Sequence, residues 1–426
     1  MILVAKTYWG GMPFWFREKP KDASVESLVL RAHDMRQVRA LWWTEAAHPR
    51  PRKAVLLLHP RVDFHHHYAI PRLVAAGFGV LAANSRYVGS ELMAEHEEMV
   101  LDAEACMRWL KEKAGAPKVA LFGNSGGGSL LSFYQAEASR PPNERLAASP
   151  AGTPTRFESA AMPKADALLL VAAHRGQGRV VEEAIDPSVV DEDDPLATET
   201  SLDMYAPENG FVEPPAWSTY DPAFVTKYRA AQRARVERID AIARAHVARK
   251  NEATAESEAA GFGERPFAER QGVLKRRAFE PVMVVYRTMA NLNYTTQALD
   301  PSPRAYGSLL SDRPDLMNHA ALGFARTVTP RAWLSTWSGV SSNADLVKNV
   351  ARIHEPTLFV HAERDREIYP RTDAKVAFEA CGASDKRFVV IEGARHYFEP
   401  DFGERAAPDV ERVMDIVVPW LEERLA

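Results

Sequence analysis

Residues 119–128 constrain this chain most, because a short apolar run there breaks into Gly-Asn-Ser-Gly-Gly. The run 119–122 is typical of a buried strand, and residues 129–138 have the pattern of a helix. A serine on the sharp turn between such a strand and helix, here Ser125, has its hydroxyl pushed out above the sheet. Glycines on either side let strand and helix pass closely. The pattern predicts a nucleophilic serine, with the backbone N–H of Gly126 at the helix start, where it stabilises an oxyanion.

Other continuous apolar runs alternate with helical patterns on both sides of this turn. Such runs are typical of strands buried on both faces of a parallel sheet, and they span residues 54–59, 79–83, 167–172, 356–361 and 387–391. Two earlier runs, 27–32 and 38–43, are candidates for antiparallel strands. Helical patterns cover residues 68–76, 99–113, 372–380 and 408–425. The alternation predicts an α/β core with a mostly parallel sheet flanked by helices.

The middle of the chain, residues 175–351, breaks this rhythm. It opens with an acidic, proline-punctuated loop, continues with a long charged helical run over 222–260, and has shorter apolar helical stretches such as 279–292 and 320–327. No convincing buried strand can be found in it. We therefore expect a core made of residues 1–174 and 352–426, interrupted by a mostly helical insertion.

Composition excludes several classes of partner. The formal net charge of −4 gives no reason to expect nucleic acid or an anionic membrane. Two cysteines, Cys106 and Cys381, are too few for a disulfide scaffold and favour free thiols in a reducing compartment. Residues 1–20 lack the apolar segment of a secretion signal, and no run approaches the ~18 apolar residues of a membrane span. We expect a cytoplasmic protein. The long charged helix is expected to be either solvated or a subunit contact, and in the second case the protein would be a homodimer.

Nucleophilic serine catalysis needs a base within hydrogen-bond reach and a carboxylate that orients the base. Turns after the last two predicted strands supply both, in Asp365 and His396. The chain order Ser125, Asp365, His396 is the order that the strand–serine–helix arrangement requires. Asp373 and Glu363 are competitors for the carboxylate role.

At this point the sequence resembles the α/β-hydrolase fold family, over the whole of the first and last segments. The resemblance rests on the Gly-Asn-Ser-Gly-Gly turn, on the turns of Asp365 and His396, on residues 59–61 in the position of the family's oxyanion loop, and on residues 84–90, which look like the family's D-x-R-G-x-G-x-S stretch. It implies that the insertion is a cap over the active site. It also implies a second oxyanion donor on the amide of Arg61, with Val62 as the alternative, because Pro60 has no N–H.

The chain departs from the family pattern in three places. Pro60 replaces a glycine, Asn84 and Tyr87 replace the usual Asp and Gly, and the insertion is longer than the family's compact caps. Substrate-binding residues therefore cannot be carried over. Candidates from the sequence itself are His65 in the triple-histidine run, Arg86 in the loop after the fourth strand, and Trp337 among the aromatic residues of the insertion.

Metal and cofactor sites are not indicated. Three adjacent histidines, 65–67, cannot all point at one ion from a regular element. The acidic run 191–194 lacks the glycine and the spaced ligands of a calcium loop and is expected to be solvated.

The leading hypothesis is a serine hydrolase that cleaves a carboxylic ester of a small apolar or aromatic molecule through an acyl-enzyme, without a cofactor. Cleavage of a carbon–carbon bond next to a ketone, or of an amide, would use the same triad. A non-catalytic binding protein is a further alternative, which an intact Ser, Asp and His set disfavours. A serine rather than an aspartate at the turn argues against dehalogenase and epoxide hydrolase chemistry.

Overall fold

The computed structural model describes residues 19–400, 404 and 406–426. Eight strands form one sheet in the order β1-β2-β4-β3-β5-β6-β9-β10. They are β1 (Ala23–Arg31), β2 (Gln37–Glu45), β3 (Lys53–His59), β4 (Gly79–Asn84), β5 (Lys118–Asn124), β6 (Ala167–Val171), β9 (Thr357–Ala362) and β10 (Lys386–Ile391). β2 runs antiparallel to both β1 and β4, and all other pairs are parallel. The predicted α/β class and the mostly parallel sheet are confirmed, and the two early runs form the antiparallel pair β1 and β2.

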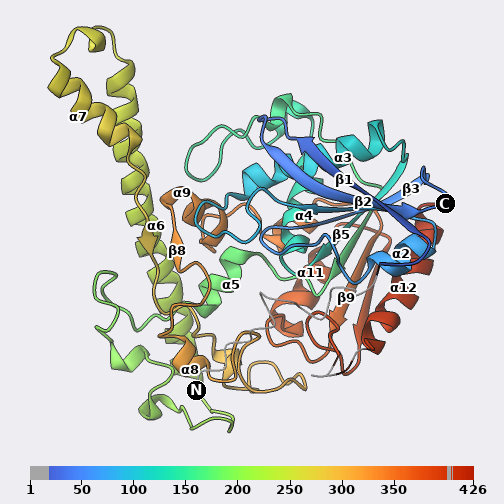
Figure 1. Cartoon of the computed structure of the whole chain (residues 1–426). Coiled ribbons are helices and arrows are strands. Elements are labelled where there is room, and N and C mark those ends of the chain that lie inside the picture. The colour runs from blue at the N-terminus through green and yellow to red at the C-terminus, as the bar shows by residue number, and fades with distance from the viewer. Residues whose placement is uncertain (1–18, 401–403, 405) are drawn as a thin grey trace.

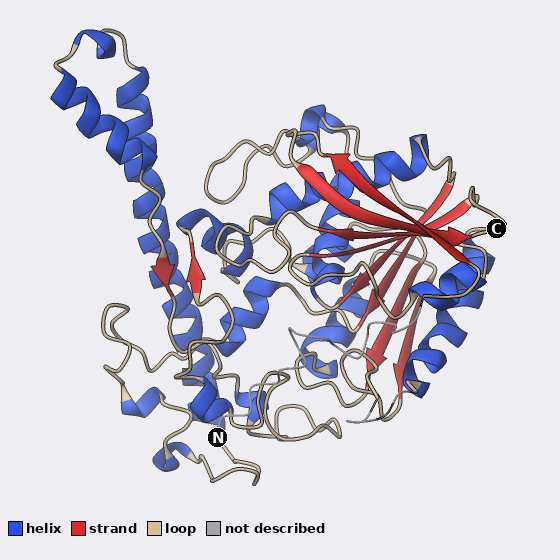
Figure 2. Cartoon of the chain, viewed as in Figure 1, coloured by secondary structure: helices blue, strands red, loops and turns tan. Residues whose placement is uncertain are grey.

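Helices cover both faces of the sheet, as Figures 1 and 2 show. α2 (Ile70–Ala75) and α12 (Pro408–Arg424) pack on one face, where they meet residues such as Val55 and Leu57 of β3. α3 (His96–Glu112), α4 (Gly126–Ala138), α10 (Leu346–Val350) and α11 (Lys375–Ala380) pack on the other, against the alternate residues Leu56 and Leu58. Successive strand residues point to opposite faces, so strands covered on both sides must be apolar throughout.

Residues 172–356 connect β6 to β9 and contain most of the irregular structure. Their helices are α5 (Gln177–Ala184), α6 (Pro222–Glu258), α7 (Phe267–Ala278), α8 (Pro314–Met317), α9 (Pro330–Ala332) and α10, and two short strands, β7 (Met283–Val284) and β8 (Thr327–Val328), pair antiparallel. α10 packs with the core, so the part of this segment that lies away from the sheet ends before residue 346. The long charged helix appears where the sequence predicts it.

Two shorter helices predicted from the sequence, 279–292 and 320–327, are wrong. These segments are largely extended or looped. Their backbone groups bond to neighbouring segments: Val285 N donates to Arg326 O at 3.1 Å, and Ala290 N donates to Ala184 O at 2.7 Å. Tertiary partners for the backbone therefore override the local helical pattern.

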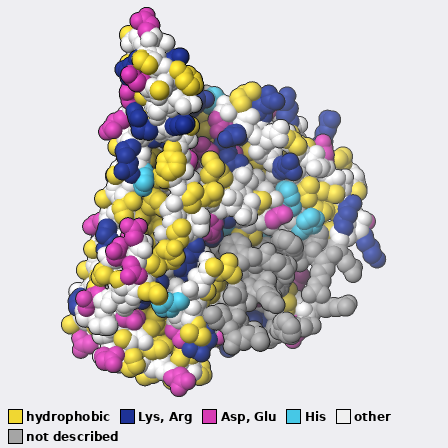
Figure 3. Space-filling view, turned by 60° about the vertical axis from the view of Figure 1, so that its left-hand side comes forward, with side chains coloured by type: hydrophobic (Ala, Val, Ile, Leu, Met, Phe, Trp, Pro, Cys, Tyr) yellow, Lys and Arg dark blue, Asp and Glu magenta, His cyan; other side chains and the backbone are white. Residues whose placement is uncertain are grey.

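The outer half of α6 and all of α7 project from the body as a helical arm (Figure 1). Ion pairs join its two helices, among them Arg276–Glu256 at 2.8 Å. Hydrophobic and charged side chains are mixed over this side of the molecule in Figure 3. Within the described ranges, no helix is long and apolar enough to cross a membrane.

Candidate active site

Ser125 stands on the turn between β5, which ends at Asn124, and α4, which begins at Gly126. Its φ of 51° and ψ of −125° lie in a region that non-glycine residues rarely adopt. The neighbouring glycines make this turn sterically feasible. A Cβ on Gly123 would come within 2.6 Å of the Gly128 Cα, and one on Gly127 within 2.5 Å of the Leu58 carbonyl oxygen on β3. The turn has the geometry that presents a side chain to a reactant.

The structure brings the three residues of the predicted triad together. His396 Nε2 lies 2.9 Å from Ser125 Oγ, and His396 Nδ1 lies 2.7 Å from Asp365 Oδ2. The other carboxylate oxygen of Asp365 accepts hydrogen bonds from the backbone N–H groups of Glu367, at 2.8 Å, and Ile368, at 3.0 Å. Ser125, Asp365 and His396 are each only 1% exposed. The hydroxyl, imidazole and carboxylate thus form a buried chain that can move a proton away from Ser125 Oγ.

The competing carboxylates have other partners. Asp373 Oδ2 accepts from the Tyr369 N–H at 2.9 Å, and Glu363 Oε2 accepts from the Gly393 N–H at 2.8 Å. Each holds a turn near the site, and the described contacts bring Asp365 alone of the three into hydrogen-bond contact with His396.

The charges around His396 favour its protonated form. Burial lowers its pKa, but the Asp365 carboxylate, with smaller contributions from Glu367 and Glu399, outweighs burial and raises the pKa to about 9. Burial acts on Asp365 in the opposite sense, and the positive charge of His396 nevertheless holds the pKa of that carboxyl below its usual value. An imidazolium formed when His396 takes a proton is therefore stabilised.

The order of the strands decides the fold class. Ser125 follows β5 in the middle of the sheet, Asp365 follows β9, and His396 follows β10. In this eight-stranded sheet, β2 runs in the direction opposite to the other strands. The chain has the α/β-hydrolase fold.

Comparisons with solved structures gave distant similarities over most of the chain. A DcsB structure, described as a complex with its substrate analogue, is 11% identical with a TM-score of 0.48, over 94% of this chain and 99% of that chain. Est1E from Butyrivibrio proteoclasticus is 11% identical with a TM-score of 0.44, over 94% and 98%. The esterase EaEST from Exiguobacterium antarcticum is 13% identical with a TM-score of 0.40, over 93% and 100%. No protein-family model and no curated protein matched the sequence.

Of the two predicted oxyanion donors, the structure places Gly126 as expected, at the first turn of α4. The backbone N–H of Arg61 has a different partner: it donates to His59 Nδ1 at 3.0 Å, as does the N–H of Val62 at 2.9 Å. The loop after β3 therefore folds back onto the ring of His59, and neither predicted amide is directed at Ser125 in this structure. The cause is local, because His59 ends β3 two residues before Arg61 and its ring reaches back over the loop.

The side chain of Arg61, by contrast, reaches the neighbourhood of the triad. Its guanidinium lies 4.9 Å from the ring centroid of Trp337 and forms an ion pair with Glu91. Its charge is among the causes that lower the pKa of His59 and of His174, after burial, which is the largest. Trp337 is fully buried in the insertion. The structure thus brings two of the predicted site residues, Arg61 and Trp337, into contact with each other above the sheet.

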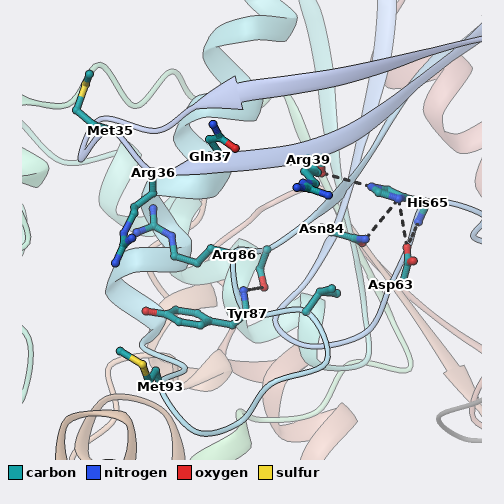
Figure 4. Close-up of a pocket in the computed structure, with 12 residues that line it drawn as sticks. Met35, Arg36, Gln37, Arg39, Asp63, His65, Asn84, Arg86, Tyr87 and Met93 are labelled. Atoms are coloured by element: carbon teal, nitrogen blue, oxygen red, sulfur yellow. Dashed lines mark hydrogen bonds and ion pairs between the residues drawn. The ribbon is translucent and has the colours of Figure 1, made fainter. Parts of the chain in front are cut away.

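His65 and Arg86 lie elsewhere. They line a separate cavity of about 770 Å³ beside β2, shown in Figure 4, whose lining does not include Ser125 or His396. Arg86 bonds to Asp102, through Nη2 at 2.6 Å, and to Asp34, through Nη2 at 3.0 Å. These ion pairs tie the β1–β2 turn to α3, and the structure does not bring either residue to the serine.

Within the triple-histidine run, His67 contacts the residue that precedes Ser125. His67 is buried, and its Nε2 lies 3.0 Å from Asn124 Oδ1. Burial lowers its pKa to about 3.

The residues that the structure describes contain no cluster of potential metal ligands. The acidic run 191–194 is anchored as well as solvated, because Glu192 pairs with Arg235 of α6 at 2.7 Å.

Sequence reasoning missed the side chains of three buried residues near Ser125, namely His59, His174 and Gln177. The positions of His59 and His174 in the sequence could have pointed to them. His59 is the last residue of β3 and His174 lies three residues beyond β6, and these strands flank β5 in the sheet. Polar residues at the carboxyl ends of the strands next to the serine strand are expected to meet at its turn.

Proposed function

We propose that this protein is a serine hydrolase that cleaves a carboxylic ester of a small, largely apolar molecule through an acyl-enzyme. The observation that carries the proposal is the continuous hydrogen-bonded chain from Ser125 Oγ through His396 to Asp365, with distances of 2.9 and 2.7 Å. A buried serine on a strained turn, paired with an imidazole that a carboxylate orients, is the arrangement that nucleophilic acyl transfer needs.

The proposed reaction has two halves. Ser125 Oγ attacks the ester carbonyl carbon while its proton passes to His396 Nε2, and the carbonyl oxygen becomes an oxyanion. When the oxyanion collapses, the bond to the alcohol oxygen breaks and His396 gives its proton to that oxygen. A water molecule then attacks the acyl-enzyme, His396 takes the proton of the water, and Ser125 leaves with that proton as the acid is released. These steps use no cofactor.

The insertion is proposed to act as a cap over this site. Its segment 329–343 docks on the loop between β4 and α3 and on the first turn of α3: Thr329 N donates to Leu92 O at 2.8 Å, and Asn343 Nδ2 donates to Glu97 Oε1 at 2.9 Å. The burial of Ser125 and His396 fits a cap, because excluding water strengthens electrostatic contacts with the reacting atoms.

A surface cavity of about 410 Å³ supports the assignment of an apolar substrate. It lies between the loop 89–92 and the insertion, and Arg61 forms part of its lining. Its lining, like that of the cavity beside β2, does not include Ser125 or His396. Arg61 links it to the site, because Arg61 also contacts Trp337 and its charge lowers the pKa of His59, and this cavity is therefore the proposed approach to Ser125. The apolar part of its lining consists of Leu92, Leu310, Met317, Ala321 and Leu322.

The test is a substrate panel run on the purified full chain and on Ser125→Ala. p-Nitrophenyl esters of increasing acyl length are compared with anilides and β-diketones. Hydrolysis of the esters that disappears in Ser125→Ala supports the proposal. Cleavage of the diketones or the anilides alone would replace the ester assignment, and activity that survives in Ser125→Ala would overturn the serine mechanism.

A further inference from the structure

Three side-chain nitrogen atoms converge beside Gly126, the residue that follows the nucleophile. A Cβ placed on Gly126 would lie 2.7 Å from Gln177 Nε2, 2.9 Å from His59 Nε2 and 3.1 Å from His174 Nε2. A side chain on residue 126 would therefore have to displace these nitrogen atoms. The space beside its Cα is lined by polar groups from the end of β3, from the loop after β6 and from the start of α5.

Both histidines present a hydrogen-bond donor to this point. His59 Nδ1 accepts the backbone N–H groups of Arg61 and Val62, at 3.0 and 2.9 Å, so the ring proton must reside on Nε2. His174 Nδ1 likewise accepts the N–H of Gly176 at 3.0 Å, which also leaves the proton on Nε2. Backbone contacts therefore fix the tautomer of each ring and direct an N–H toward Gly126.

These rings are neutral donors at neutral pH. Burial, the charge of Arg61 and the charges of neighbouring histidines place the pKa of His59 well below its usual value. Burial is also the largest cause for His174, followed by the charges of His396 and Arg61, and lowers its pKa to about 3. A neutral imidazole N–H can polarise a carbonyl oxygen without carrying a full charge into a buried site.

The cluster lies at the reacting centre. Gly126 adjoins Ser125 and begins α4, where the first N–H groups of the helix have no partner within the helix. His59 and His174 both lie close enough to His396 for its charge to affect them. The two imidazole N–H groups therefore flank the residue that directly follows the nucleophile.

We propose that the oxyanion is held by the Gly126 N–H together with the Nε2–H groups of His59 and His174, with the Gln177 amide beside them. This assignment rests on the proposed serine mechanism. It replaces the backbone amides of Arg61 and Val62, which are bonded to His59 instead. The loop after β3 thus contributes a side-chain donor, and its amides serve to lock the ring that carries this donor.

The experiment uses variants that keep the loop contacts and remove only the inward donor. In His59→Asn and His174→Asn, the amide oxygen can take the place of Nδ1 as acceptor for the backbone, while the Nε2–H is lost. His174→Gln is the matched control, because its longer side chain can return an N–H to the position of Nε2. Thermal unfolding of each variant shows whether the fold is intact.

Removal of one oxyanion donor is expected to lower kcat by about 10²–10³-fold with little change in KM, because the contact forms only with the charged intermediate. His174→Gln should recover a large part of that loss. If both Asn variants keep kcat within about threefold of the parent while Ser125→Ala is inactive, the oxyanion assignment is wrong and the serine mechanism stands. A rise in KM alone would also overturn it. Activity that survives in Ser125→Ala would overturn both.

Discussion

Replacement of Asp365 by asparagine tests how the carboxylate orients His396. Oδ1 of Asp365 accepts two backbone N–H groups, from Glu367 and Ile368, so an asparagine must place its oxygen there. Its NH₂ group then faces His396 Nδ1 at the position that Oδ2 occupies now, 2.7 Å away. Two donors cannot share that contact, and the ring must adopt the tautomer with Nε2–H directed at Ser125.

That tautomer cannot accept the serine proton, so kcat is expected to fall by up to about 10⁴-fold, as loss of the orienting carboxylate does in serine proteases. KM should change little, because Asp365 is buried behind the imidazole. The assay is steady-state hydrolysis of the best ester from the panel, with thermal unfolding to confirm that the variant is folded.

Asp373→Asn is the matched control. Burial raises the pKa of Asp373, which favours its neutral form, and its Oδ2 accepts from the Tyr369 N–H rather than from His396, so activity should stay near that of the parent. A loss of less than about tenfold in Asp365→Asn, or an equal loss in Asp373→Asn, would refute the orientation argument.

Four further predictions follow from the contacts described above. Since His396 must be neutral to accept a proton and its pKa lies near 9, kcat/KM should fall about tenfold per pH unit below that value. Glu367→Gln removes an anion that raises this pKa, so the acid limb of the pH–rate profile should move to lower pH, and an unmoved limb would contradict the electrostatic account. Gly126→Ala should reduce kcat by at least about 10²-fold, because its Cβ would displace three donors; unchanged kcat would show that the space is not used. Arg86→Met should destabilise the fold by about 3–5 kcal/mol, since it leaves Asp102 buried without its partner, whereas exposed Arg36→Met should change the unfolding free energy little; equal effects in a denaturant titration would argue against a structural role for Arg86.

The fold and the triad could be predicted from the sequence because each rests on a local pattern. Apolar runs mark the strands, and the order of the turns after them sets which residues meet at the edge of the sheet. Ser125, Asp365 and His396 each lie in the turn that follows a strand, so their proximity depends mainly on strand order.

The second oxyanion donor could not be predicted in the same way. The position of Arg61 after β3 indicates a backbone donor, but the direction of its N–H depends on where the ring of His59 lies, which is a tertiary contact. His174 and Gln177 meet His59 only because β3 and β6 both border β5. Arg86 lies in a loop that resembles a family motif, yet its three-dimensional partners are Asp34 and Asp102.

The insertion shows the limit of periodicity. The charged helix α6 was predicted because its run of charged residues is long. The structure adds a cap at its start, where the Asp221 side chain accepts the backbone N–H of Ala223 at 2.7 Å. Residues 279–292 carry a similar apolar spacing but adopt an extended path, because a buried network fixes them. In that network Arg287 bonds to Asp186 and to Ser188 at 2.9 and 2.8 Å.

The central claim, that Ser125 is the nucleophile, is tested most directly by mapping the covalent intermediate. The full chain is treated with a fluorophosphonate or mixed rapidly with a p-nitrophenyl ester, acid-quenched, and analysed by mass spectrometry of the intact protein and of its peptides. The account predicts one adduct per chain, on the peptide that contains Ser125, and none in Ser125→Ala. An adduct on another residue, or ester turnover by a chain that the fluorophosphonate neither labels nor inhibits, would contradict it.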